Sequence, residues 1–260
     1  MRVGALLAAA LTLFPAVRAQ AASFLNPEIP AQPCRPTIAC TAEFGPAGAV
    51  QLELGYLGKE LENAPFQHSI PFLLDLNATG WLQIQLGGQG VFSQPATYFD
   101  NLSLGLKAML LKQSDYLPTV SFSATVSVPT FAGQTGYTRI TDLFFAGYVS
   151  KDFGPIHADF NLALNVWRID GTAEPQPWAA LSFSTNLTTR FGADLETYVF
   201  GSADPVATKD AGVLAALTFS PSPFLTFDAG GDVSLFRDVR SYSLFVGLTV
   251  VLANLYEQPK

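Results

Sequence analysis

Hydrophobic and polar residues alternate strictly along residues 119–128, whose sequence is TVSFSATVSV. Every even-numbered position is apolar, and every odd-numbered position is Ser or Thr. Side chains alternate between the two faces of a β-strand, so the pattern predicts a strand with one apolar face and one face of hydroxyl groups. A stretch of this length matches the roughly 9–11 residues that a tilted strand needs to cross the hydrocarbon core of a bilayer.

The same alternation recurs from residue 49 to residue 252, for example in residues 50–56 and 242–252. Consecutive apolar residues leave its phase ambiguous only around residues 140–150. About twelve strands can be counted, an even number, as single-chain bacterial barrels require. The pattern therefore predicts an all-β fold, a transmembrane up-and-down antiparallel β-barrel of about twelve strands.

Turn-forming residues separate the predicted strands at alternating short and long intervals. Compact Asn-, Gly- and Pro-containing turns are expected at residues 77–80, 151–155 and 220–223. Longer links, including residues 87–97 and 168–177, are expected between them. Because barrels of this kind have short periplasmic turns and longer extracellular loops, the alternation also predicts the orientation of the barrel in the membrane.

Residues 1–48 follow a different pattern. A basic start, an apolar run over residues 3–14 and small residues up to Ala19 predict a secretory signal peptide over residues 1–19, because the run is too short for a membrane helix. Residues 20–48 are rich in Pro and predict an irregular lead that is either periplasmic or inserted into the lumen. Residues 253–260 are expected to form a C-terminal tail.

Cys34 and Cys40 are the two cysteines of the chain. In an exported protein they predict a small disulfide loop within the lead. Zinc needs about four ligands, and the nearest histidine in the sequence is His68. No metal site and no cofactor are therefore expected.

The composition agrees with a membrane barrel. Charged residues make up 13% of the chain, against ~25% in ordinary soluble domains, and the mean hydropathy is +0.28. A soluble lipocalin-like barrel is the alternative, but its water-facing side would carry many Lys and Glu residues, whereas here that side is mostly Ser, Thr, Asn, Gln, Gly and Asp.

The charge argues against nucleic acid as a partner. The full chain has a net charge of -7, and removal of the signal, which holds Arg2 and Arg18, leaves 12 basic against 21 acidic residues, or -9. The expected partners are outer-membrane lipids, the barrel-assembly machinery during insertion, and a small-molecule solute.

The alternation places a set of charged residues on the predicted lumen face. Seven acids and one lysine share this face: Glu53, Asp75, Lys107, Asp159, Asp194, Glu196, Asp228 and Asp232. One interpretation is a selectivity region in which Asp75, Asp159, Asp194 and Asp228 form a loose acidic belt that favours cations. The other is that these acids bond to Ser, Thr and Lys107 and simply fill a narrow barrel.

Catalysis is not expected. His68 and His157 are the only histidines, and Ser69 points to the opposite face from its neighbour His68, so the two cannot act as base and nucleophile. The preferred function is a channel or passive transporter for small solutes. A closed structural or adhesive barrel that acts through its extracellular loops is the second hypothesis, and an outer-membrane enzyme is the third.

Several short motifs also carry a family resemblance. Leu54-Gly55-Tyr56 and the segments 104–107, 126–130 and 150–155 resemble the transporter-like outer-membrane proteins named for the meta-pathway of phenol degradation. The resemblance covers most of residues 49–252. It implies an outer-membrane barrel of a Gram-negative bacterium that passes small, aromatic compounds, and it brings no defined ligand residues with it.

Overall fold

The computed structural model describes residues 23–24, 28–61, 66–93, 96–128, 141–203, 207, 209–236 and 241–256. The predicted signal peptide lies outside the described residues and stays a prediction. The strands are β1 (Ser23–Phe24), β2 (Ala49–Leu61), β3 (Gln67–Asn77), β4 (Leu82–Ser93), β5 (Ala96–Leu111), β6 (Thr119–Val128), β7 (Asp142–Phe153), β8 (Ile156–Ile169), β9 (Thr172–Asn186), β10 (Phe191–Phe200), β11 (Asp210–Ser222), β12 (Leu225–Ser234) and β13 (Ser241–Asn254).

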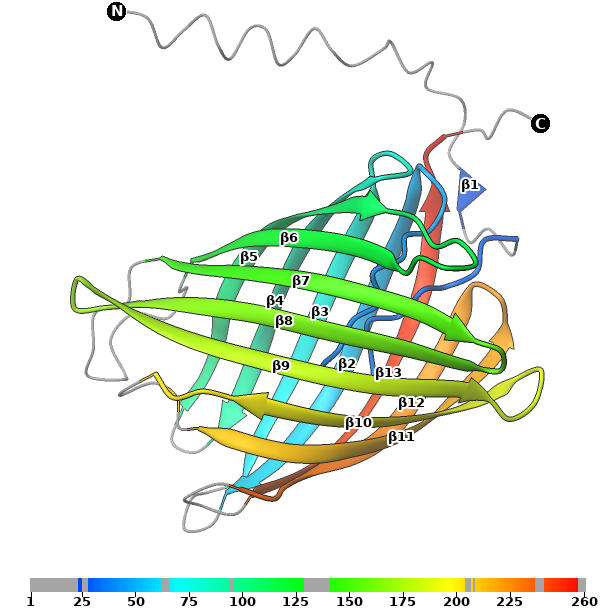
Figure 1. The fold of residues 1–260 in the computed structure, drawn as a ribbon. Helices are drawn as coiled ribbons and strands as arrows, with labels where there is room; N and C mark the ends of the chain where they lie inside the picture. Colours follow the sequence, from blue (N-terminus) through cyan, green and yellow to red (C-terminus); the bar gives the residue numbers. More distant parts are fainter. Residues whose placement is uncertain are drawn as a thin grey trace, which may run out of the picture.

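Strands β2 to β13 form a closed barrel (Figure 1). Each strand pairs antiparallel with its neighbour in the chain, and β13 pairs back with β2 along nearly its whole length. The predicted up-and-down barrel of twelve strands is therefore confirmed. Closure gives every strand two hydrogen-bonded neighbours, which leaves no free sheet edge within the barrel wall.

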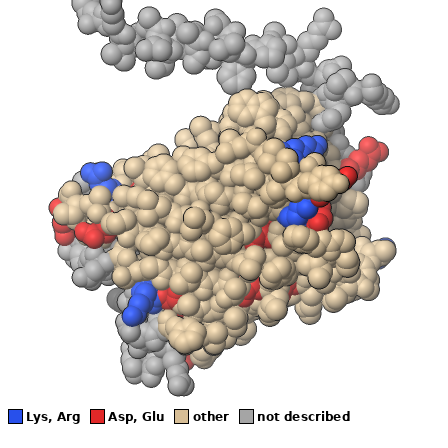
Figure 2. Space-filling model, viewed as in Figure 1, with Lys and Arg blue, Asp and Glu red and all other residues tan. Residues whose placement is uncertain are grey.

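The two faces of the wall differ as the alternation predicts. In β6, Ser121, Ser123 and Ser127 are buried inside the barrel, whereas Phe122 and Val126 are exposed on the outside. Large apolar side chains cover the outer face elsewhere, among them Leu162, 60% exposed, and Leu244, 64% exposed. Figure 2 shows that the outer face in this view is largely uncharged, with charged side chains gathered mainly toward the ends.

Strand β7 resolves the ambiguous phase of residues 140–150. Ala146 and Tyr148 are buried inside the barrel, so Phe144 also points inward, where its ring packs edge-on against Trp167 at 5.4 Å. Leu143 and Phe145 face outward. The period was hidden in the sequence because both faces of the wall are apolar at this point.

The long links predicted at residues 168–177 and 87–97 are wrong. Strands β8 and β9 continue to a two-residue turn in which Asp170 (φ 48°) and Gly171 (φ 86°) have positive φ, a turn whose twist matches a hairpin. Residues 87–97 lie mostly within β4 and β5. Strand β13 also runs through Asn254, two residues beyond the predicted end of the barrel at residue 252.

Pro175 and Pro177 misled the prediction because proline normally ends a central strand. The carbonyl of Pro177 accepts a hydrogen bond from Gly201 N at 2.7 Å, on the side of β10. Residues two apart in a strand face the same neighbour, and β10 has already ended at Phe200. Both prolines therefore lie where no ladder hydrogen bond from their nitrogen is needed.

Within the described residues, no helix is long and apolar enough to cross a membrane.

The two ends of the barrel differ in the connections that they carry. The turn end carries the connections between β3 and β4, β5 and β6, β7 and β8, β9 and β10, and β11 and β12. The loop end is the opposite one. The chain leaves β13 at the turn end, where Leu255 N donates to Gly48 O at 2.8 Å, so the segment that precedes β2 enters the barrel from this side.

The two faces of β6 should respond differently to an introduced charge. Ala124→Arg, which places a cation on the outer face near the middle of the strand, should lower the free energy of unfolding by ~2–4 kcal/mol in a bilayer. Thr125→Arg, on the lumen face, should be better tolerated. Denaturant unfolding of both variants in lipid vesicles measures the difference, and equal losses would contradict the assignment of the faces.

Candidate functional site: a lumen filled by the N-terminal lead

Residues 28–48, called the lead below, run inside the barrel in an irregular conformation. Near the turn end, Ala31 N donates to Pro223 O at 2.8 Å. Gln32 and Gln51 then exchange two hydrogen bonds, from Gln32 N to Gln51 Oε1 at 2.8 Å and from Gln51 Nε2 to Gln32 O at 2.9 Å. The side chain of Gln51 on β2 thus pairs with the lead as a neighbouring strand would.

A disulfide joins Cys34 to Cys40, with their Cα atoms 4.5 Å apart. The residues between them fold back on themselves, and Thr37 Oγ1 donates to Ala39 O at 2.8 Å. This compact loop cannot pair with the barrel as a strand. Its backbone N–H groups therefore need acceptors from side chains of the wall.

Two buried glutamates supply those acceptors from two separate strands of the wall. Glu53 on β2 accepts hydrogen bonds from Cys34 N at 2.8 Å and Arg35 N at 3.1 Å. Glu196 on β10 accepts hydrogen bonds from Ile38 N at 3.0 Å and Ala39 N at 2.7 Å, and both glutamates are at most 2% exposed. Each carboxylate thus holds a pair of consecutive N–H groups, an arrangement in which both its oxygens are used.

The segment after the disulfide is held by side chains of β5, β6 and β7. Ala42, fully buried, donates from its N–H to Ser150 Oγ at 2.6 Å, and its carbonyl accepts from Ser121 Oγ at 2.5 Å. Lys107 Nζ donates to Thr41 O at 2.5 Å. The same ammonium lies 4.6 Å from the centre of the Tyr148 ring, so a cation–π contact stabilises the buried charge.

Arg35 forms an ion pair between the lead and the wall. Its Nε and Nη2 donate to the two carboxylate oxygens of Asp228 on β12, at 3.3 and 3.2 Å. Asp228 is buried, so the guanidinium supplies the opposite charge that a buried carboxylate requires.

Two large cavities lie in the lumen beside the lead, one toward each end of the barrel. The loop-end cavity has a volume of about 590 Å³, and its walls include Leu57, Trp167 and Phe200. The turn-end cavity has a volume of about 480 Å³, and its walls are mostly hydroxyl, amide and carboxyl groups. Arg35 and Pro36 line both cavities, so these two residues of the lead form part of the wall that separates them.

All eight predicted lumen residues lie on the inward face, but not as one ring. Asp159 and Asp194 line the turn-end cavity. Asp232 lines the loop-end cavity, where Tyr198 Oη donates to it at 2.8 Å. Asp75 accepts from Gln85 Nε2 at 3.2 Å beside the start of the lead. Glu53, Glu196, Asp228 and Lys107 bind the lead directly.

The residues that complete these contacts, chiefly Arg35 and Ser150, are not among those predicted from the sequence. Arg35 carried a usable signal, because it is the only basic residue in the predicted lead, whereas the predicted lumen face is strongly acidic. Ser150 carried none, since it is one of many inward hydroxyls.

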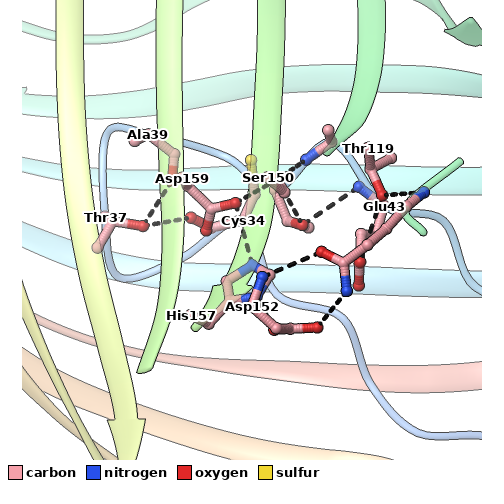
Figure 3. Close-up of polar contacts among 12 residues, drawn as sticks. Cys34, Thr37, Ala39, Glu43, Thr119, Ser150, Asp152, His157 and Asp159 are labelled. Atoms are coloured by element: carbon pink, nitrogen blue, oxygen red, sulfur yellow. Dashed lines mark hydrogen bonds and ion pairs between the residues drawn. The ribbon is translucent and has the colours of Figure 1, made fainter. Parts of the chain in front are cut away.

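Ser150, Asp159 and His157 lie close together, which invites a comparison with a catalytic triad (Figure 3). His157 contacts Asp152 Oδ1 through Nδ1 at 2.7 Å and Asp159 Oδ1 through Nε2 at 3.1 Å. Ser150 Oγ donates to Asp159, however, and it is fully buried under Ala42. A serine nucleophile needs a base within hydrogen-bond reach and an open approach, so this cluster holds the lead rather than activating Ser150.

No protein-family model matches the sequence, and no curated protein matches it. Solved structures do match the fold. An outer-membrane channel from Pseudomonas putida F1 superposes with a TM-score of 0.61 and 11% sequence identity, over 81% of this chain and 98% of that one. The NanC porin superposes with a TM-score of 0.59 and 8% identity, over 77% of this chain and 100% of that one. At such identities the likeness is one of fold.

Loss of either glutamate should loosen the lead. Glu53→Gln and Glu196→Gln each place an amide donor against a backbone N–H, which should destabilise the seated lead by about 1–3 kcal/mol. The disulfide between Cys34 and Cys40 should then be reduced about tenfold faster or more by a phosphine reductant in the folded barrel. Asp194→Asn is the control, because no described hydrogen bond joins Asp194 to the lead; equal rates in all variants would contradict the anchoring role.

Proposed function

We propose that this protein is an outer-membrane channel or passive transporter for small solutes of a Gram-negative bacterium, with the turn end in the periplasm. In this proposal it is a relative of the proteins named for the meta-pathway of phenol degradation. The observation that carries the proposal is the pair of cavities at opposite ends of the lumen, separated by the lead. The structure is then the closed state, and conduction requires the lead to move.

The kind of contact that holds the lead supports this proposal. Most of its bonds to the wall run to polar side chains, such as Glu53, Glu196 and Ser150. Water can replace such partners once a lumen fills, whereas it cannot replace apolar packing. Few large apolar side chains take part, since the buried apolar residues of the described lead are Ile29, Ala39 and Ala42.

A preference for cations is the second part of the proposal. Asp159 and Asp194 face the turn-end cavity, whereas Arg35 and Lys59 match the two acids of the loop-end cavity, Asp210 and Asp232. Acidic groups in a narrow pore with walls of low dielectric constant concentrate cations near them. Asp228 is left out of this part, because Arg35 neutralises it in the closed state.

Small aromatic solutes are the third part. The loop-end cavity carries the rings of Trp167, Tyr198, Phe200 and Phe245. Its volume of about 590 Å³ falls within the ~300–1,000 Å³ that is usual for small-molecule sites. Ring faces and edges in such a cavity favour the stacked or edge-on packing of another aromatic ring.

Conductance across a planar bilayer tests the channel. The full-length wild-type chain should show a small or rarely open conductance, and Glu53→Gln combined with Glu196→Gln should increase it severalfold, because the lead is then less firmly held. Phenol added on the loop side should reduce the current. Asp194→Asn controls for the loss of lumen charge alone. A barrel that is folded, as its mobility before and after boiling in SDS shows, but never conducts would instead support the closed structural or adhesive barrel.

The reversal potential in a salt gradient tests the preference for cations. At low salt the open channel should select cations, and replacement of Asp159 and Asp194 together with Asn should shift the reversal potential toward zero. Salt screens the exposed charges over about 10 Å at 0.1 M, so the shift should shrink as the salt concentration rises. Selection of anions by the wild-type channel would exclude this part of the proposal.

A further inference from the structure

We infer that the inner wall contains a binding site for a guanidinium group, which the chain's own Arg35 occupies in the closed state. The site consists of the Asp228 carboxylate, the Val246 carbonyl, and the bare backbone of Gly55 and Gly247. A free guanidinium compound should therefore compete with the lead for the site. This consequence for opening rests on the proposed channel function, whereas the site itself does not.

The barrel register brings the components together in one row. Asp228 on β12 pairs with Gly247 on β13, and Gly247 pairs with Gly55 on β2. The three residues are thus next to one another across three strands, and all face the lumen. The Asp228 side chain is 2% exposed, and both of its oxygens accept from the Arg35 guanidinium. Arg35 Nη2 also lies 3.4 Å from Val246 O.

The paired glycines provide the space for the cation. A Cβ atom placed on Gly247 would lie 2.5 Å from Arg35 Nε, and one placed on Gly55 would overlap the guanidinium carbon. Glycine weakens the interior of a strand and often marks the close approach of a ligand or of another backbone. Here two glycines face each other in register, and a planar group lies against both.

The geometry favours a guanidinium over an ammonium ion. A guanidinium is flat, so it fits against two residues without side chains, and its fork of N–H groups can engage both oxygens of a carboxylate. An ammonium ion is compact, strongly hydrated and tetrahedral, and it can satisfy only part of this set. The site therefore recognises shape as well as charge.

Solutes can reach this site from the lumen. The Arg35 side chain is 18% exposed, and Arg35 lines both the loop-end and the turn-end cavity. Because Arg35 is tethered, its effective concentration at the site is of the order of millimolar or higher, so a free compound must exceed that range to displace it. Removal of the Arg35 side chain should lower the concentration that is needed.

Full-length Arg35→Ala protein, folded in detergent, provides the direct test. The probes are methylguanidinium and methylammonium, which carry the same charge on a planar and a tetrahedral group. Isothermal titration calorimetry should show methylguanidinium binding at least about tenfold more tightly, because only the planar ion can engage both carboxylate oxygens. Wild-type protein, whose site is filled, should show little binding at the same concentrations.

Second substitutions in the Arg35→Ala protein locate the binding. Asp228→Asn removes the charge, and Gly247→Ala fills the space; each should abolish the preference for methylguanidinium. Gly55→Ala replaces Gly247→Ala if that variant does not fold. Gly147→Ala, on the outer face, and Asp194→Asn, elsewhere in the lumen, should leave the preference unchanged. Equal binding of the two probes, or a preference that survives both changes at the site, would overturn the inference.

A bilayer measurement separates the site from the channel. Methylguanidinium at a concentration of the order of 100 mM, above the effective concentration of the tethered Arg35, should increase the open probability of the wild-type channel more than methylammonium does. If calorimetry shows the preference and no variant conducts, the site stands and the proposed channel function fails. If the channel conducts and calorimetry shows no preference, the proposed channel function stands and the guanidinium site fails.

Discussion

A backbone that passes through the inside of a closed barrel must find partners for its N–H and C=O groups, and that requirement organises this lumen. The wall cannot offer them from its own backbone, since closure of β13 on β2 uses the ladder positions. Side chains of the wall therefore have to supply the hydrogen-bond partners of the lead. Glu53 and Glu196 each hold two consecutive N–H groups, and Ser121 and Ser150 hold the two polar groups of Ala42.

The same requirement explains three of the lumen acids, Glu53, Glu196 and Asp228. Among side chains, a carboxylate has the greatest capacity to accept hydrogen bonds and no competing donor. A lead that presents N–H groups and one guanidinium therefore selects acids on the wall opposite. A given acid can serve to bind the lead or to attract ions from solution. Under the proposed channel function, Glu53 and Asp228 would bind the lead in the closed state and face the solution once the lead has moved.

The sequence predicts the wall well and the contents of the lumen poorly, for physical reasons. The period of two along each strand reflects burial on one side only, and residues such as Phe122 and Ser123 report it directly. The period fails to predict the strand at Phe144, because both faces of the wall are apolar there. It also fails at Pro175, because the neighbouring strand β10 has ended and proline is tolerated. The partners of Glu53 and Glu196 could not be predicted, because an irregular segment such as residues 34–40 has no periodicity to place it against a wall. An inward acid has the same local sequence signature whether it faces water or an amide.

The row of Asp228, Gly247 and Gly55 crosses the seam at which the last strand of the barrel meets the first. Gly55 and Gly247 are separated by most of the chain, and only the pairing of β13 with β2 makes them neighbours. In an unclosed sheet the two halves of this row stand at opposite edges. This constrains the order of assembly. Arg35 can contact both glycines only after β13 has paired with β2, so a seated Arg35 indicates a closed barrel.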